Sequence, residues 1–201
     1  MTRVFAGKKL LIGSRNHAKR QQLIDALEPY DLDFVMAEET DVEDPEETGK
    51  TFLENALIKA KAYSQGSNLP TLADDSGLVI PALDGAPGIY SSRFAAEHGG
   101  FDRAFLALEE KLKGLSTEAY ITSTVVLMWP DGIYVSGVGE TWGDLVFPAR
   151  PGIGFGYYPI FRPKGETKTI SEMAPQEYNV ISLSHRKKSM GALIAQSFKA
   201  V

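Results

Sequence analysis

The segment of residues 119–139 constrains the fold most strongly, because it predicts a β-hairpin. Residues 119–128 (AYITSTVVLM) and 133–139 are rich in the β-branched and aromatic side chains that favour strands. The Pro-Asp-Gly sequence at 130–132 lies between these two runs and is typical of a tight turn. The chain is therefore expected to contain a pair of neighbouring antiparallel strands.

Helical and strand patterns alternate along the rest of the chain. Short apolar runs predict strands at residues 10–12, 33–37, 71–73 and 78–80, and helical spacing or capping sequences predict helices at residues 17–27, 51–64, 101–112 and from Ser184 onward. This alternation, together with the hairpin, predicts an α/β fold with strands of mixed direction. No repeat or low-complexity linker divides the sequence, so residues 1–201 are expected to form a single domain.

The composition excludes several kinds of chemistry. The chain has no cysteine, which removes a thiol nucleophile, a cysteine-liganded zinc, an iron–sulfur cluster and any disulfide. Its three histidines, His17, His98 and His185, are far apart and lack the spacing of a zinc motif. Catalysis would therefore depend on carboxylates, lysines, hydroxyls and a metal that prefers oxygen ligands.

The charge balance and the lengths of the apolar segments limit the kinds of partner that the chain is expected to bind. The chain has 21 lysines and arginines against 26 aspartates and glutamates, a net charge of −5, which argues against binding a nucleic-acid polymer. A local basic pocket for a small anion remains compatible with that balance. Residues 125–129 form too short an apolar run to span a membrane, and residues 1–9 lack the apolar core of a signal peptide. A cytoplasmic protein without a membrane partner is expected.

The sequence after the first predicted strand is suited to bind phosphate. This segment consists of Ser14, Arg15, Asn16, His17, Ala18 and Lys19. It lies where a strand passes into a helix, and backbone N–H groups at such a junction favour anions. Cations at a helix N-terminus are unfavourable unless an anion is bound there. The alternative interpretation is a surface helix that Asn16 caps and whose cations are solvated.

A second candidate set surrounds the next predicted helix. Thr51 and Glu54 form a capping box, which assigns Glu54 to the helix N-terminus. Glu47 precedes this cap and is a candidate metal ligand, and Lys59 shares a helix face with Asn55, four residues earlier. The alternatives are a solvated loop acid for Glu47 and an exposed helix lysine for Lys59.

Asp74 and Asp75 form the third candidate set. Aspartate is disfavoured in strands, yet this pair ends an apolar strand, where ligands of α/β sheets commonly bind. Adjacent strand residues point to opposite faces, so the two carboxylates need not share one role. Asp75, beside a predicted turn at Ser76 and Gly77, is the candidate metal ligand or general base, and Asp74 is a candidate supporting group. An Asx turn is the alternative.

Two further segments complete the candidate set. Residues 154–159 (GFGYYP) combine glycines with aromatic rings, which permits close approach to a flat ligand such as a nucleobase. A plain turn with rings in the core is the alternative. Residues 184–188 (SHRKK) place further cations at a helix start. The cationic segments, the acids and the aromatic loop together predict a nucleoside phosphate bound with Mg²⁺.

These motifs resemble the inosine triphosphatase family, which removes aberrant purine nucleotides. The family pattern reads T/S-x-N-x-x-K, ETG-x-TF-x-ENA-x-x-KA, DDSGL, GAPG-x-YS, GFGYDPIF and SHR. This chain has the corresponding segments, in the same order, at residues 14–19, 47–60, 74–78, 85–91, 154–161 and 184–186. The resemblance covers nearly the whole chain, from Leu10 to about Ala195.

The resemblance implies an elongated, two-lobed α/β fold with a curved mixed β-sheet and a central cleft, and a homodimer. It implies Mg²⁺-dependent hydrolysis of nucleoside triphosphates such as ITP, dITP and XTP to the monophosphate and pyrophosphate. Glu47 and Asp75 would hold the metal, and Asp75 and Lys59 would be catalytic. The implied substrate-binding residues are Ser14, Arg15, Asn16, His17, Ala18, Lys19, Ser76, Phe155, Gly156, Tyr157, Tyr158, His185 and Arg186.

The sequence departs from the family pattern at three places. Tyr158 stands where GYDPIF has an aspartate. The family segment EKN-x-x-SHR carries a base-contacting lysine, whereas the corresponding segment here, Glu177 to Ser184, has no lysine and has extra residues. Gln22 stands where an acid commonly follows the phosphate-loop lysine. The first two changes fall on base recognition, so altered purine selectivity is expected. A catalytically weak nucleotide sensor and a nucleic-acid-binding module are the alternatives from other classes.

Overall fold

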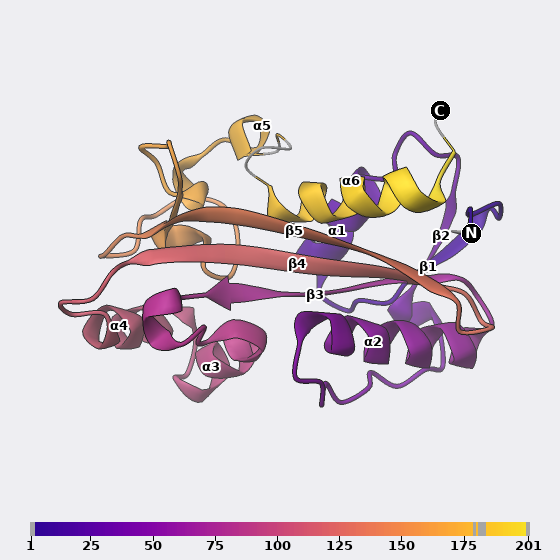
Figure 1. Cartoon of the computed structure of the whole chain (residues 1–201), viewed down its shortest axis with the longest axis horizontal. Coiled ribbons are helices and arrows are strands. Elements are labelled where there is room, and N and C mark those ends of the chain that lie inside the picture. Colours follow the sequence, from indigo (N-terminus) through magenta and orange to yellow (C-terminus); the bar gives the residue numbers. More distant parts are fainter. Residues whose placement is uncertain (1–2, 179, 181–183, 200–201) are drawn as a thin grey trace. The chain divides into compact units, whose positions relative to one another are not determined.

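The computed structural model describes residues 3–178, 180 and 184–199 and confirms the α/β fold. Figure 1 labels the main elements along the chain. The elements are β1 (Lys9–Ile12), α1 (His17–Asp25), β2 (Asp33–Met36), η1 (Ala37–Glu39), α2 (Phe52–Ser67), β3 (Thr71–Val79), η2 (Pro81–Leu83), η3 (Gly88–Tyr90), α3 (Ser91–Glu97), α4 (Phe101–Lys111), β4 (Glu118–Met128), β5 (Tyr134–Leu145), η4 (Tyr158–Ile160), β6 (Phe161–Pro163), η5 (Ile170–Glu172), α5 (Pro175–Tyr178) and α6 (His185–Ser197).

The described strands form one mixed sheet in the order β2-β1-β3-β4-β5-β6. β1 pairs in parallel with both β2 and β3, whereas β5 and β6 are antiparallel. The predicted hairpin strands β4 and β5 are neighbours in this sheet, and β5 continues to Leu145, six residues beyond the predicted end. The predicted mixture of strand directions is therefore confirmed.

The prediction of two short strands at 71–73 and 78–80, separated by a turn, is wrong. One continuous strand, β3, runs through both segments, so Asp74 and Asp75 lie inside a strand. The sequence suggested a break because aspartate and glycine disfavour strands. The structure compensates this preference with partners, since each carboxylate lies beside a cation. The Asx turn considered for these residues is likewise absent from this described segment.

The chain divides into two compact units, which are described separately. Unit 1 comprises residues 1–75, 123–139 and 186–201, and unit 2 comprises residues 76–122 and 140–185. Each unit has its own apolar core within the described residues. In unit 2 this core gathers side chains from α4, β4 and the segment 157–178.

In unit 1, helices cover both faces of the strands (Figure 1). Ala56 and Ala60 of α2 pack on Ala73 of β3, together with two side chains of β4. Leu72, the neighbour of Ala73, instead packs with residues of α1 and α6. Successive strand residues alternate between faces, which explains this division. Adjacent residues 74 and 75 can thus serve different faces as well.

Local caps begin the helices that carry the candidate residues. Asn16 accepts a hydrogen bond from the backbone N–H of Lys19 at 3.1 Å, which confirms the predicted cap of α1. Thr51 caps α2 by accepting from the N–H of Glu54, also at 3.1 Å. The Glu54 carboxylate accepts from the backbone N–H of Lys50, one residue before Thr51, the partner expected in a capping box.

Among the described residues, no helix has both the length and the apolar character needed to cross a membrane.

Candidate active site

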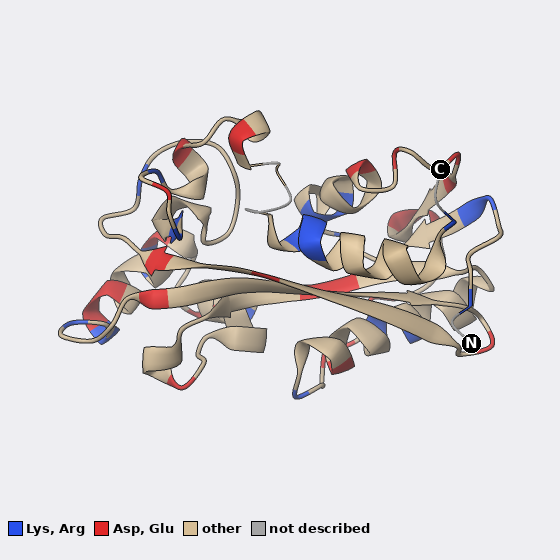
Figure 2. Cartoon of the chain, turned by 45° about the horizontal axis from the view of Figure 1, so that its top comes forward, with Lys and Arg blue, Asp and Glu red and all other residues tan. Residues whose placement is uncertain are grey.

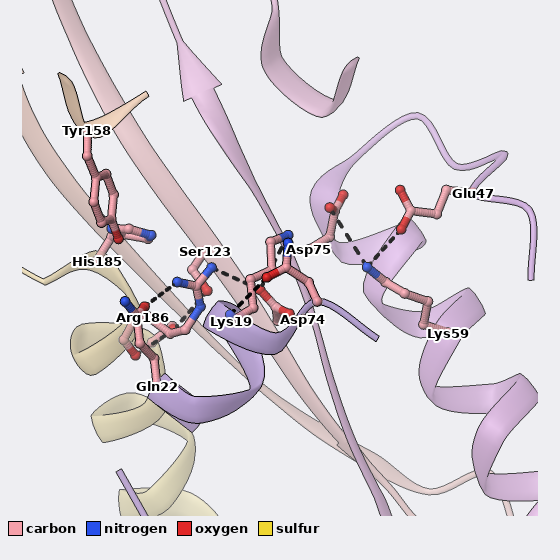
Figure 3. A network of polar contacts seen from close by, with 12 residues as sticks. Lys19, Gln22, Glu47, Lys59, Asp74, Asp75, Ser123, Tyr158, His185 and Arg186 are labelled. Atoms are coloured by element: carbon pink, nitrogen blue, oxygen red, sulfur yellow. Dashed lines mark hydrogen bonds and ion pairs between the residues drawn. The ribbon is translucent and has the colours of Figure 1, made fainter. Parts of the chain in front are cut away.

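A lysine held by two carboxylates forms the first part of the site, in unit 1 (Figure 3). Lys59 Nζ lies 2.8 Å from Glu47 Oε1 and 4.0 Å from Asp75 Oδ1. Its side chain projects from α2, Glu47 from the loop before α2, and Asp75 from β3. Lys59 and Asp75 are buried and Glu47 is half-buried, so the alternative of an exposed helix lysine does not apply.

Burial and the neighbouring charges set the protonation of this group. Burial raises the pKa of Asp75 above its ordinary value, although Lys59 and Lys19 act in the opposite direction. Burial would lower the pKa of Lys59, but Asp74, Asp75 and Glu47 together raise it. Lys59 is therefore a firm cation at neutral pH, and Asp75 is a carboxylate with a greater affinity for a proton than an exposed aspartate.

The donor set of this group fits a hard divalent cation. Two carboxylates, of Glu47 and Asp75, already converge on one positive charge. Within residues 3–178, 180 and 184–199, no cluster of three or more acidic, histidine or cysteine side chains could hold a metal by itself. Mg²⁺ in phosphate-processing sites is commonly held by one or two carboxylates and the phosphates of the substrate. The residues present match that arrangement.

Asn55 links the loop before α2 to Asp75. Its Nδ2 donates to Asp75 Oδ2 at 3.1 Å, and its Oδ1 accepts from the backbone N–H of Gly49 at 2.8 Å. A Cβ added at Gly49 would lie 2.6 Å from Asn55 Oδ1, so only glycine allows this approach. The sequence placed Asn55 on the face of Lys59 but did not include it among the site residues.

Asp74 is the centre of a second charged group in unit 1 (Figure 3). Its carboxylate is fully buried and lies 3.2 Å from the Arg186 guanidinium and 3.8 Å from Lys19 Nζ. Gln22, the departure from the family acid, accepts from Arg186 at 2.5 Å. Although burial opposes it, the charges of Lys19 and Arg186 lower the pKa of Asp74 far below its usual range. Asp74 is therefore a charged carboxylate that pairs with Lys19 and Arg186 of the same unit.

Contacts with strands β5 and β4 hold helix α6 in place, and Arg186 lies in the first turn of this helix. A Cβ at Gly137 of β5 would lie only 2.1 Å from the backbone oxygen of Ser189, so glycine lets the helix approach the strand closely. The Ser189 hydroxyl donates to Ser123 Oγ of β4 at 3.2 Å. The first turn of α6 contains no acidic residue, and Figure 2 shows basic residues there.

The residues of the predicted phosphate loop differ in their placement. Ser14 is buried, Asn16 and His17 are exposed, and Ala18 and Lys19 are half-buried. Burial lowers the pKa of Lys19, with Asp74 opposing the shift.

The Arg15 side chain is held by the chain itself. It donates to Tyr63 Oη at 3.3 Å and to the backbone oxygen of Val42 at 3.0 Å. Tyr63 in turn donates to Asp44 at 2.8 Å. Arg15 therefore ties the phosphate loop to the acidic loop that carries Glu47, a contact that the sequence did not predict.

In unit 2, the candidate base-recognition residues form an aromatic cluster. Phe155 is half-buried, and its ring centroid lies 5.1 Å from that of Tyr158. Tyr158 and Tyr178 are buried, and their hydroxyl oxygens are 3.1 Å apart. Tyr178 Oη is also 3.1 Å from His185 Nδ1. The structure thus brings three polar aromatic side chains into one hydrogen-bonded chain.

The other predicted residues of unit 2 take supporting positions. Tyr157 is buried, and its hydroxyl donates to the backbone oxygen of Ser91 at 2.8 Å. Burial raises the pKa of Tyr157, so this hydroxyl stays protonated. Ser76 and Gly156 are half-buried. Asn179 and residues 181–183, part of the segment that departs from the family's EKN motif, lie outside the described residues.

Comparison with known proteins identifies the family. The model of the Ham1 family matches residues 10–196. The chain belongs to the Ham1 family. A dITP/XTP pyrophosphatase of Rhodospirillum centenum is 41% identical over 200 residues, covering 98% of each chain. The structure of a HAM1 protein from Coxiella burnetii superposes with a TM-score of 0.86 and 33% identity, over 94% of this chain and 98% of that one. A nucleoside-triphosphatase / dITP/XTP pyrophosphatase structure from Mycobacterium abscessus has a TM-score of 0.74 and 33% identity, over 89% of this chain and 94% of that one.

Membership of the Ham1 family confirms the family resemblance drawn from the motifs. Motif spacing found the residues that carry the charge in both groups, namely Lys19, Glu47, Lys59, Asp74, Asp75 and Arg186. It missed Tyr178 as a partner of Tyr158, because twenty residues separate them and no short pattern joins them. The one available signal was that both positions depart from the family pattern.

Proposed function

We propose that this protein hydrolyses nucleoside triphosphates to the monophosphate and pyrophosphate, with aberrant purine nucleotides such as ITP, dITP and XTP as substrates. The observation that carries the proposal is the convergence of Glu47 and Asp75 on Lys59. The relatives named dITP/XTP pyrophosphatase support it. Two oxygen donors beside a fixed cation suit a reaction that separates negatively charged phosphates.

The residues of unit 1 would carry the phosphate chemistry. Glu47 and Asp75 would hold Mg²⁺, which supplies Lewis-acid stabilisation of the phosphate oxygens when bound. Lys59 and Lys19 would neutralise the triphosphate, and the loop of Ser14–Lys19 would donate backbone N–H groups to it. Asn55 holds Asp75 in its orientation through the bond of 3.1 Å.

Asp75 is also the proposed general base. Its raised proton affinity suits a carboxylate that takes a proton from the attacking water. The water oxygen forms a bond to the α-phosphorus, the bond from this phosphorus to the oxygen that bridges to the β-phosphorus breaks, and pyrophosphate leaves. Asp74 does not compete for this role, because the charges of Lys19 and Arg186 lower its pKa against the effect of burial and leave it a poor proton acceptor.

The residues of unit 2 would recognise the base. Phe155 is half-buried, so part of its ring is accessible for stacking on a purine. His185 would contact the polar edge of the base, and Ser76 would contact the substrate. Arg186, which the resemblance places near the base, is bound to Asp74 and Gln22; we therefore propose that it orders the phosphate half. Tyr158 and the missing lysine near Tyr178 would alter the base preference.

A nucleotide panel tests this proposal. The purified protein is assayed with ITP, dITP, XTP, GTP and ATP at fixed Mg²⁺, and the products are resolved by ion-exchange chromatography. We expect pyrophosphate and the monophosphate, with ITP, dITP and XTP hydrolysed faster than ATP. Release of orthophosphate with a diphosphate, or no turnover of any triphosphate, would contradict it.

The homodimer and the cytoplasmic location remain part of the proposal, and light scattering after size exclusion tests the dimer.

A further inference from the structure

The acidic loop, defined as residues 40–50 between η1 and α2, carries the proposed metal ligand Glu47. Its eleven residues include five carboxylates and one cation, Lys50, and lie outside the helices and strands. Like charges in such a segment repel one another and extend the chain. Contacts with other parts of unit 1 must therefore hold this loop where Glu47 meets Lys59 at 2.8 Å (Figure 3).

Arg15 and Tyr63 hold the first half of the acidic loop. The Arg15 guanidinium donates to the backbone oxygen of Val42 at 3.0 Å and to Tyr63 Oη at 3.3 Å. Tyr63 Oη donates in turn to Asp44 Oδ1 at 2.8 Å. Burial and the neighbouring Asp44 carboxylate raise the pKa of Tyr63, so its hydroxyl stays protonated and remains a donor. One hydroxyl thus connects the phosphate loop to the acidic loop.

Two glycines allow this half of the loop to pack closely. Gly66 lies within α2, where glycine lowers helix stability. A Cβ at Gly66 would lie 2.6 Å from Val42 Cγ2, so glycine gives Val42 room to lie on the helix. A Cβ at Gly13, just before the phosphate loop, would lie 3.1 Å from the fully buried Tyr63 ring. Tyr63 therefore packs beside both loops.

Asn55 holds the second half of the acidic loop. Its Oδ1 accepts from the backbone N–H of Gly49 at 2.8 Å, and its Nδ2 donates to Asp75 at 3.1 Å. Glu47 therefore lies between two held positions, Asp44 three residues before it and Gly49 two residues after it. Holding both sides of Glu47 reduces the conformational entropy that it would lose on binding a metal.

We propose that Arg15 and Tyr63 are positioning residues that form a latch on the acidic loop and so preorganise Glu47 for a divalent cation. The Arg15 guanidinium then serves the metal side of the site instead of binding the triphosphate. The clause on the metal rests on the proposed function, whereas the latch does not. Arg15 and Asp44 are exposed, so each contact of the latch contributes no more than an ordinary hydrogen bond.

Cleavage by a glutamyl endopeptidase measures the latch directly, because the acidic loop contains Glu43, Glu46 and Glu47. When local opening is fast, the cleavage rate follows the population of the open loop. Mass spectrometry locates the cuts. We expect cleavage at these sites to be about two- to tenfold faster in Arg15→Met and in Tyr63→Phe than in the wild type, the effect of one hydrogen bond.

Matched variants control for the loss of a charge or a hydroxyl. Lys61→Met removes an exposed cation of α2, and Tyr30→Phe removes the hydroxyl of a half-buried tyrosine elsewhere in unit 1. Both should be cleaved at the wild-type rate. Arg15→Met combined with Tyr63→Phe should accelerate cleavage by less than the product of the two single effects, because the two side chains share one hydrogen bond.

The Mg²⁺ dependence of turnover tests the clause on the metal. At saturating ITP, the Mg²⁺ concentration for half-maximal rate should rise by about two- to tenfold in Arg15→Met and in Tyr63→Phe. Saturating Mg²⁺ should restore kcat in both variants. If Arg15→Met instead raises the KM for ITP at saturating Mg²⁺, and Tyr63→Phe does not, Arg15 binds the triphosphate and the inference is overturned.

The outcomes separate the latch from the proposed function. Unchanged cleavage in both folded variants would overturn the latch, whatever the protein hydrolyses. Faster cleavage with an unchanged Mg²⁺ requirement would refute the clause on the metal. If no triphosphate is hydrolysed, the proposed function fails and that clause fails with it, while the cleavage rates still decide whether Arg15 and Tyr63 hold the acidic loop.

Discussion

The two units treat polar groups in opposite ways. Unit 1 buries charges and pairs them, as in Asp74 with Lys19 and Arg186, and Lys59 with Glu47. Unit 2 buries neutral hydroxyls and joins them in a chain from Tyr158 to His185. Charges suit a phosphate chain and a metal, whereas directed hydrogen bonds suit the edge of a base. Under the proposed function, we expect a division of labour, in which the residues of unit 1 set the rate and those of unit 2 the choice of nucleotide.

The largest effect is expected from Asp75→Asn in unit 1. This change removes the proposed base and one of the two proposed metal ligands, while it keeps the size of the side chain and a carbonyl oxygen for Asn55. The kcat should fall by about a thousandfold for every nucleotide. Asp31→Asn, which alters an exposed pair with Lys8, is the matched control. An Asp75→Asn enzyme with wild-type turnover would refute the assignment.

The same variant should become more stable. Burial raises the pKa of Asp75, so the folded chain binds this proton more tightly than the unfolded chain. The charged form therefore destabilises the fold at neutral pH, and a neutral amide removes that cost. Urea unfolding at pH 7 should show a gain of up to about 1 kcal/mol. A clear loss of stability would show that the charge of Asp75 is structural.

Lys59→Met should lower kcat/KM about a hundredfold, because it removes the cation proposed to neutralise the triphosphate. The same helix supplies a control, since Lys61 is exposed on α2. Lys61→Met should therefore leave the kinetics unchanged. Steady-state assays with ITP compare the two variants. Equal losses in both would indicate a general effect of positive charge on this helix.

Asp74→Asn should lower the stability of the fold, whereas Asp75→Asn should raise it. It leaves Arg186 and Lys19 without their buried counter-charge, and we expect a loss of about 3 kcal/mol in unfolding free energy at pH 7. The pKa of Asp74 is depressed, so its stabilisation is present at neutral pH and is lost as the pH falls from about 4 downward. Urea unfolding at a series of pH values should show a shallower acid dependence in the variant. The same acid dependence as in the wild type would contradict this role.

The smallest effect is expected in unit 2, from Tyr158→Phe. It deletes one hydroxyl and leaves every charge of unit 1 in place, so turnover of ITP should change by less than about threefold. Its effect should appear in the ratio of ITP to ATP instead. A loss shared equally by both nucleotides would place Tyr158 in the general support of the fold.

The sequence predicted the charged residues of unit 1 better than the neutral, hydrogen-bonded aromatic residues of unit 2. Lys59, Glu47 and Asp75 lie in short motifs whose residue types already suggest metal and phosphate chemistry, and the structure brings them together. Both ends of strand β3 were predicted, but its continuation through Asp74 was missed, because local preferences there could not reveal partners from α1 and α6 that lie 55 and 112 residues away in sequence. Local strand preference is weaker than such tertiary contacts.

The aromatic residues of unit 2 make contacts between segments that no single motif contains. Tyr158 and Tyr178 each read as an isolated departure, and only the fold places their hydroxyls in contact. Arg15 presents the reverse case, since its motif predicts a phosphate ligand whereas its guanidinium contacts Tyr63 and Val42. Long side chains have several possible partners, and the sequence does not choose among them.

The division of labour is tested most directly by the kcat/KM of ITP, XTP, GTP and ATP in the wild type, Lys59→Met and Tyr178→Phe. The account predicts that Lys59→Met lowers all four values by one common factor, so that their ratios stay as in the wild type. It predicts that Tyr178→Phe changes the ratio of ITP to ATP by about three- to tenfold. Changed ratios in Lys59→Met, or a common factor for all four nucleotides in Tyr178→Phe, would contradict it.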